Sequence, residues 1–160
     1  MKKLSLTMLL LITGAGTMAQ ASRNPVTFYS AENLRRAIET APLEGRQRGL
    51  FSLRLSASSD PEVIGIRRTA AAKAELHSDM TDVWYVIDGN ATLVTGGKLA
   101  GSVETTGGEI RAARIDDGES RDVKKGDYAV IPAGTPHWIS KVASKDFQYI
   151  VVKVPAQKSP

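Results

Sequence analysis

The chain has 160 residues, of which 24% are charged and 42% belong to the AVILMFWYC set, a composition typical of one globular domain and not of a disordered chain. It contains no cysteine, which excludes disulfides, thiolate metal ligands and a cysteine nucleophile. The formal net charge is +4, and removal of Lys2 and Lys3 with a leader would leave 19 basic against 17 acidic residues, or +2, which gives little reason to expect nucleic-acid binding.

The first 21 residues have the pattern of a secretory signal. Lys2 and Lys3 make the start positive, residues 4–12 are mostly apolar, and Ala19 and Ala21 place small residues at positions −3 and −1 of a cleavage point. The apolar run is shorter than the ~20 residues of a membrane span. We therefore expect a signal peptide over residues 1–21, cleaved after Ala21, and export to the periplasm or the medium, with an uncleaved anchor as the alternative.

A helix is predicted near the start of the mature chain. Ser30 is a favourable N-cap. Apolar residues follow it at helical spacing: Leu34, Ala37, Ile38 and Ala41. Pro42 and Gly45 indicate where the helix ends. With the strand after it, this helix makes up a predicted N-terminal segment over residues 22–55.

From Phe51 onward the hydrophobic period changes to two, which indicates strands. The expected strands lie at residues 51–55, 63–66, 73–77, 82–87, 91–95, 109–115, 127–131, 137–142 and 147–154. Short strands separated by turn residues are typical of an all-β sandwich or barrel, which we place at residues 56–154 with a tail at 155–160. Residues 98–108 are polar and rich in glycine, and we expect them to form a mobile loop at the rim.

The two histidines of the chain are the basis for predicting a metal site. A transition metal would need His77 and His137 together with carboxylates. If residues 73–77 and 82–87 form a hairpin, His77 faces Asp82, and Glu75 lies on the same face. Two carboxylates inside a barrel resist joint ionisation, and a divalent cation would cancel their charge. The pattern therefore predicts a divalent metal, Fe, Mn or Zn, at these residues.

His137 follows a rigid corner. Pro132, Gly134 and Pro136 fix a tight turn between two predicted strands. A stiff backbone gives the imidazole a defined direction, which a preorganised ligand needs. We therefore expect His77 and His137 to converge on one cation inside the barrel.

The corner resembles a motif of a known family. Gly126-x5-Pro132-x-Gly134-x2-His137 is similar to the second motif of the cupin family, G-x5-P-x-G-x2-H-x3-N, with Lys141 in place of the asparagine. The resemblance covers about residues 70–154. It implies a double-stranded β-helix, which is a jelly-roll barrel, with a metal in the interior facing an open mouth.

The first cupin motif, G-x5-H-x-H-x3-4-E-x6-G, is kept less well. His77 and Gly89 match its second histidine and its last glycine, whereas Thr69, Glu75 and Asp82 replace its first glycine, first histidine and glutamate. The usual cupin ligands are three histidines and a glutamate. Here the resemblance implies a ligand set of His77, His137, Asp82 and Glu75.

Three functions are compatible with such a barrel. The first is a metal-dependent enzyme, of the oxygenase or isomerase type, that acts on a small polar molecule and uses Glu75 as a general base if Glu75 is not a ligand. The second is a binding module for a small ligand, with or without a metal. The third is a structural barrel whose segment before Ser56 crosses to a partner, and a homodimer is expected.

Two of the site residues also have a structural interpretation. Glu75 could form an ion pair with Arg111 or Arg114 instead of holding a metal or a proton. His137 could be a core histidine whose ring bonds a backbone carbonyl.

The register and the aromatic residues leave further alternatives. Asp79 would take the place of Asp82 if the hairpin shifted by one residue. Trp84, Tyr128 and Trp138 are the predicted pocket residues, because Trp84 follows Asp82 on one face and the other two flank the corner. Aromatic residues at such positions also commonly belong to the core.

Overall fold

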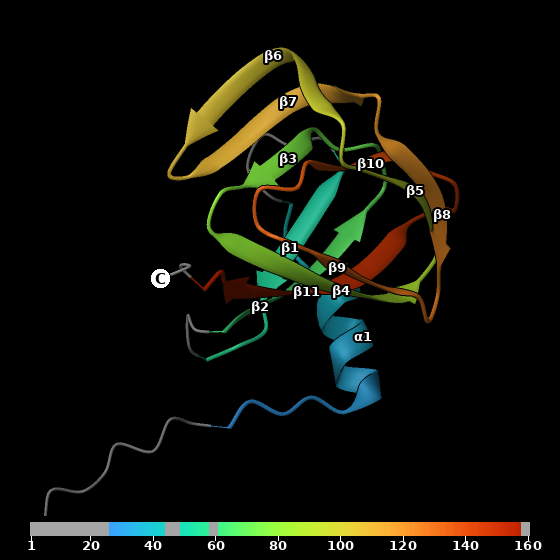
Figure 1. The fold of residues 1–160 in the computed structure, drawn as a ribbon. Helices are drawn as coiled ribbons and strands as arrows, with labels where there is room; N and C mark the ends of the chain where they lie inside the picture. The colour runs from blue at the N-terminus through green and yellow to red at the C-terminus, as the bar shows by residue number, and fades with distance from the viewer. Residues whose placement is uncertain (1–25, 44–48, 58–60, 158–160) are drawn as a thin grey trace, which may run out of the picture.

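The computed structural model describes residues 26–43, 49–57 and 61–157, which form one helix and eleven strands in two antiparallel sheets (Figure 1). The predicted signal peptide and Gly45 lie outside the described residues. Within these residues, no helix has the length and apolar character needed to cross a membrane.

Helix α1 (Ala31–Glu39) begins after Ser30, whose Oγ accepts a hydrogen bond from the backbone N–H of Asn33 at 3.2 Å. This confirms the predicted helix and its N-cap. Ile38 is fully buried and approaches Gly65 so closely that a side chain there would lie 2.8 Å from Cγ1 of Ile38. The helix therefore packs on the outer face of the sheet that contains Gly65 (Figure 1).

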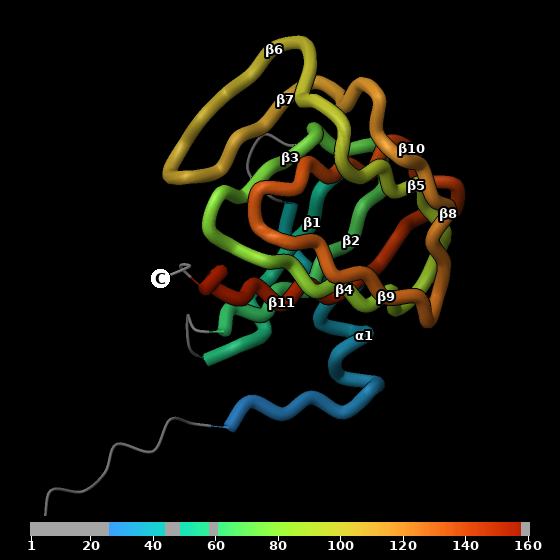
Figure 2. Tube along the Cα trace, viewed as in Figure 1, coloured from blue at the N-terminus to red at the C-terminus, as the bar shows by residue number. Residues whose placement is uncertain are grey.

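Each of the two sheets combines strands that are far apart in the sequence (Figure 2). The five-stranded sheet has the order β1 (Leu50–Arg54), β2 (Glu62–Arg68), β11 (Phe147–Pro155), β4 (Met80–Asp88) and β9 (Tyr128–Ile131). The six-stranded sheet has the order β6 (Lys98–Thr106), β7 (Glu109–Asp116), β3 (Ala74–His77), β10 (His137–Val142), β5 (Asn90–Thr95) and β8 (Glu119–Lys124). This arrangement confirms the predicted all-β jelly-roll barrel.

The main apolar core lies between the sheets and takes residues from both. Its buried members are Trp84, Val86, Ala91, Leu93, Ile131, Ile139, Phe147, Tyr149 and Val151. The inward positions of β4 and β11 are apolar near the middle of the barrel and polar toward one end. Asp82 of β4 and Lys153 of β11 are direct register partners, so both polar positions lie at the same end. The apolar core therefore gives way to charged residues at one end of the interior.

The expectation of a mobile loop over residues 98–108 is wrong. Residues Lys98–Thr106 form β6, which pairs with β7 through a turn at Gly107 and Gly108. Most of β6 is exposed, and so is β8, which the hydrophobic pattern did not predict either. These two strands are held by backbone pairing and have no buried face. Their sequences therefore lack the alternation of apolar and polar residues from which a strand is predicted.

The expected hairpin before and after Ser78 is also wrong. Strand β3 belongs to the six-stranded sheet and pairs with β7 and β10, whereas β4 belongs to the five-stranded sheet. The chain crosses from one sheet to the other at Ser78 and Asp79. His77 and Asp82 therefore approach each other across the barrel interior and not across a hairpin.

Candidate metal centre and adjoining cavity

Three of the predicted ligands meet on the inner face of the six-stranded sheet. Glu75 of β3 is the direct register partner of His137 at the start of β10, and His77 ends β3. One donor atom from each of the three residues lies within 4.8 Å of the other two. The two imidazole ring centroids are 5.2 Å apart, and both histidines are buried. The cluster could therefore hold a metal ion.

The proline corner positions His137. The backbone N–H of Gly134 donates to the carbonyl of His77 at 2.7 Å, which fixes the corner to the end of β3. Nδ1 of His137 lies 3.1 Å from the carbonyl oxygen of Thr135, an arrangement in which Nδ1 carries the proton and donates it. Burial lowers the pKa of His137, so the ring stays neutral.

The remaining ring nitrogen of His137, Nε2, has no hydrogen-bond partner among the described residues. Its Nε2 is buried and is not bonded to any residue in the described part of the chain. The interpretation of His137 as a core histidine therefore accounts for Nδ1 alone. A backbone-anchored Nδ1 with a free Nε2 lone pair is the usual state of an imidazole that binds a metal.

Asp82 reaches the cluster from the opposite sheet. Its Oδ2 lies 3.5 Å from Nε2 of His77 and 3.7 Å from Nε2 of His137, and it accepts a hydrogen bond from Nε1 of Trp84 at 3.4 Å. Asp79, its predicted alternative, lies in the exposed connection between β3 and β4.

Sequence reasoning missed Lys153, a cation that contacts this cluster. Its Nζ lies 2.8 Å from Nε2 of His77 and 3.0 Å from Oδ1 of Asp82. Burial alone would raise the pKa of Asp82, but the contacts with His77 and Lys153 lower it by a larger amount, to about 2. The signal for Lys153 was its place in the alternation that begins with Tyr149 and Val151 on the inward face of β11.

The donor set fits a divalent cation, on one condition. Two imidazole Nε2 atoms with carboxylates are ligands suited to Fe, Mn and Zn, and the free Nε2 of His137 has the lone pair that such an ion needs. The condition is that the Lys153 ammonium leaves Nε2 of His77, since both cations would use the same lone pair.

Glu75 also takes part in an ion-pair network. Oε1 of Glu75 lies 3.3 Å from Nε of Arg111, and Nη2 of Arg111 lies 2.6 Å from Oε2 of Glu109. Arg114, the other expected partner, pairs with Asp116. The carboxylate of Glu75 therefore lies between the two imidazoles and Arg111: it pairs with Arg111 and belongs to the candidate metal cluster.

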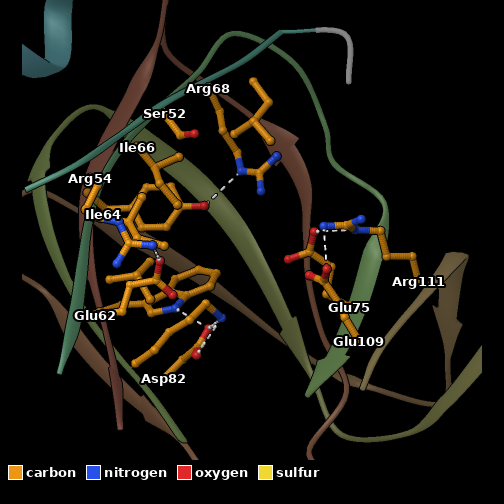
Figure 3. Close-up of a pocket in the computed structure, with 15 residues that line it drawn as sticks. Ser52, Arg54, Glu62, Ile64, Ile66, Arg68, Glu75, Asp82, Glu109 and Arg111 are labelled. Carbon is orange, nitrogen blue, oxygen red and sulfur yellow. Dashed lines mark hydrogen bonds and ion pairs between the residues drawn. The ribbon is translucent and has the colours of Figure 1, made fainter. Parts of the chain in front are cut away.

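A cavity of about 410 Å³ adjoins the cluster (Figure 3). Most of its wall consists of alternate residues of the five-stranded sheet, and β3 and β7 complete it. The lining residues are Leu50, Ser52, Arg54, Glu62, Ile64, Ile66, Arg68, Glu75, Asp82, Trp84, Glu109, Arg111, Tyr149, Val151 and Lys153.

Only one of the predicted pocket aromatics, Trp84, lines this cavity. Tyr128 is 75% exposed on β9. Trp138 alternates with His137 and therefore points to the opposite face of β10, where Nε1 donates to the carbonyl of Ala72 at 2.8 Å. Neighbouring positions on a strand face opposite sides, which is why closeness to the corner in sequence did not place these rings in the cavity.

Sequence reasoning also missed Arg68, the last residue of β2. It is 5% exposed and its Nε donates to the Tyr149 hydroxyl at 2.8 Å. Burial by itself lowers the pKa of Arg68, but Tyr149 and the charge of Glu75 raise it by more, so the guanidinium stays protonated. As with Lys153, the signal was an inward position in an alternating run, after Ile64 and Ile66.

Comparison with known proteins agrees with this architecture. The family described as Cupin matches residues 48–159. The chain belongs to the cupin family. No curated protein is similar enough to this cupin to count as a match.

Solved structures show the same fold at low sequence identity. KdgF from a Halomonas species is 15% identical with a TM-score of 0.52, over 74% of this chain and 92% of that one. A Klebsiella pneumoniae protein with a double-stranded β-helix domain is 16% identical with a TM-score of 0.52, over 84% and 95%. The DMSP lyase DddQ from Ruegeria pomeroyi is 14% identical with a TM-score of 0.54, over 81% and 64%. These similarities establish the fold of the cupin and not its activity.

Proposed function

We propose that this protein is an exported cupin that binds one divalent cation, Fe, Mn or Zn, through His77 and His137 with the carboxylates of Glu75 and Asp82. The adjoining cavity would take a small polar molecule as substrate or ligand. The observation that carries the proposal is the buried Nε2 of His137, which has no hydrogen-bond partner among the described residues and faces carboxylates from both sheets. Export and homodimerisation stay predictions.

The residues of the cluster have distinct tasks in this proposal. When bound, a divalent cation would act as a Lewis acid that polarises an oxygen of the ligand. The carbonyl of Thr135 holds the His137 ring in one tautomer and orientation. Arg111 orients the carboxylate of Glu75, which lines the cavity and is placed to accept a proton from the ligand if it does not bind the cation.

Lys153 favours a second candidate, a binding module without metal. Its ammonium already satisfies Nε2 of His77 and neutralises Asp82. In that case the cavity would bind a polar ligand through its charged side chains, and no bond would be changed.

Elemental analysis separates the two candidates. The untagged protein is purified from its own compartment beside the His77→Ala/His137→Ala variant, and circular dichroism checks that both are folded. We expect about one equivalent of a divalent metal in the native protein and none in the variant, because the variant lacks both imidazole ligands. A variant that keeps stoichiometric metal would show that the site is assigned wrongly. A native protein that takes up none of the three metals would favour the metal-free binding module.

A further inference from the structure

The cavity wall contains four basic and four acidic side chains. They are Arg54, Arg68, Arg111, Lys153, Glu62, Glu75, Asp82 and Glu109. Three of the bases have a carboxylate partner in the wall: Arg54 lies 2.6 Å from Glu62, Arg111 lies 2.6 Å from Glu109, and Lys153 lies 3.0 Å from Asp82. The fourth base, Arg68, differs from these three.

Arg68 is the most deeply buried of the four bases, and no carboxylate of the described residues forms an ion pair with it, although the charge of Glu75 acts on it from farther away. It is 5% exposed, against side-chain exposures of 50%, 32% and 18% for Arg54, Arg111 and Lys153. Within residues 26–43, 49–57 and 61–157, its guanidinium makes one hydrogen bond, from Nε to the Tyr149 hydroxyl, and no ion pair. Figure 3 shows the guanidinium of Arg68 turned toward the open space across from Asp82.

A buried guanidinium with a single neutral acceptor is energetically unfavourable. Charges taken out of water need a partner of opposite sign and hydrogen bonds for their remaining donors. Tyr149 occupies the Nε edge, and the two terminal nitrogens of this cavity-lining residue make no hydrogen bond to the described residues. Those nitrogens form a planar pair of donors, which matches the two oxygens of a carboxylate.

We infer that Arg68 is a carboxylate-binding site and that the small molecule taken up by this cavity is a carboxylic acid. One guanidinium balances one negative charge, which favours a carboxylate over a phosphate dianion. The cavity of about 410 Å³ has room for about a dozen water-sized groups of ~30 Å³ each, so the acid is small. The binding of the carboxylate by Arg68 does not depend on the proposed function. Only the placement of the rest of the ligand rests on it, since that part would extend toward the candidate metal centre.

The test follows the Nε–H signal of Arg68 in the nitrogen–proton correlation spectrum of the labelled protein. The signal is assigned by its loss in Arg68→Lys. Lactate and propionate are the carboxylate probes, lactamide and propionamide are their uncharged counterparts, and inorganic phosphate is the other anion. We expect the two carboxylates to shift the signal saturably, and the amides and phosphate to leave it in place.

Affinities of the variants give a second measurement. Arg68→Gln should weaken lactate binding by about tenfold or more, since a charge-assisted bidentate contact is lost. Arg114→Gln is the matched control, because Arg114 is exposed and paired with Asp116, and it should bind like the native protein. The spectrum of the native protein needs no substitution, so the test stands even if Arg68→Gln fails to fold.

The outcomes separate this site from the metal centre. The titrations are done on protein treated with EDTA and again with Zn²⁺, Mn²⁺ or Fe²⁺. Lactate binding that depends on Arg68 in a protein that takes up none of these metals would refute the metal site and keep the carboxylate site. The carboxylate site is overturned if neither carboxylate shifts the signal, if phosphate shifts it more than they do, or if binding is lost in His77→Ala/His137→Ala but kept in Arg68→Gln.

Discussion

Lys153 places a positive charge where the candidate ligands converge. Its ammonium contacts His77 at 2.8 Å and Asp82 at 3.0 Å, and a divalent cation would compete for the same atoms. We therefore expect Lys153→Met to raise the affinity for Zn²⁺ by about tenfold, because the cluster gains a negative net charge. Competition against a chromophoric chelator measures the change.

Lys124→Met is the control for that prediction. Lys124 is an exposed lysine on β8, so its removal changes the net charge of the protein by the same amount. Its Zn²⁺ affinity should stay near that of the native protein. Equal affinities for all three proteins would show that the Lys153 ammonium does not compete with the metal.

Ionised Asp82 stabilises the metal-free barrel, so the free energy of unfolding should decrease at acidic pH. Its pKa in the folded protein is about 2, below the ordinary value of 3.8. A depressed folded pKa stabilises the native state above the ordinary pKa, and this contribution of about 2 kcal/mol is lost as the pH falls through 2. Urea unfolding of the native protein and of Asp82→Asn should therefore give free energies that converge between pH 5 and pH 2. A difference that stays constant over this range would contradict the assignment.

Four candidate ligands could be found from the sequence because histidine is scarce and the corner before His137 is rigid. Arg68 and Lys153 could not be found by the same reasoning, since basic side chains at strand ends usually lie in water. Their inward direction follows from the period of two in β2 and β11. Their partners depend on which strands meet, which periodicity does not determine.

At the level of elements, two glycines at strand connections allow the cost of a left-handed backbone to be measured apart from the cost of a steric clash. Gly89, between β4 and β5, has φ +82°, and a Cβ there would collide with the carbonyl oxygen of Asp146 and lie 2.7 Å from Oγ of Ser144. Gly126, before β9, has φ +90°, but a Cβ there would meet open space. Gly126→Ala should cost about 1 kcal/mol for the left-handed backbone alone.

Gly89→Ala should cost about 3 kcal/mol, because overpacking adds to the same backbone term. Urea unfolding of the native protein and both variants gives the two differences, with Gly126→Ala as the matched control. Equal losses at the two positions would show that the contacts of Gly89 with Ser144 and Asp146 give way freely.

Strand identity was predictable where a strand buries one face, and not elsewhere. β10 and the middle of β11 alternate between buried and half-buried positions, and both strands are predicted from the alternation of the sequence. β6 and β8 are exposed along most of their length, so backbone pairing alone shows them to be strands. The prediction of a β3–β4 hairpin is wrong. Two consecutive strands with a short connection can pair with each other or enter different sheets, and the local sequence does not distinguish a hairpin from such a crossing.

At the scale of the whole molecule, the barrel interior has two parts with different tasks. The apolar core, with Trp84 and Tyr149 at 4.7 Å between ring centroids, holds the two sheets together. The charged end carries the candidate metal centre and the cavity. Trp84 and Tyr149 belong to both, because each packs in the core and lines the cavity.

This division predicts that the barrel folds without its metal ligands. Metal-free His77→Ala/His137→Ala should unfold in one cooperative transition and lose about 1–3 kcal/mol, whereas Tyr149→Ala should lose about 3–5 kcal/mol because it removes a core ring. Added Zn²⁺ should raise the melting temperature of the native protein by mass action and leave that of the histidine variant unchanged. Thermal unfolding followed by circular dichroism measures both effects. A histidine variant that is unfolded without metal would mean that the charged end, and not the apolar core, holds the two sheets together.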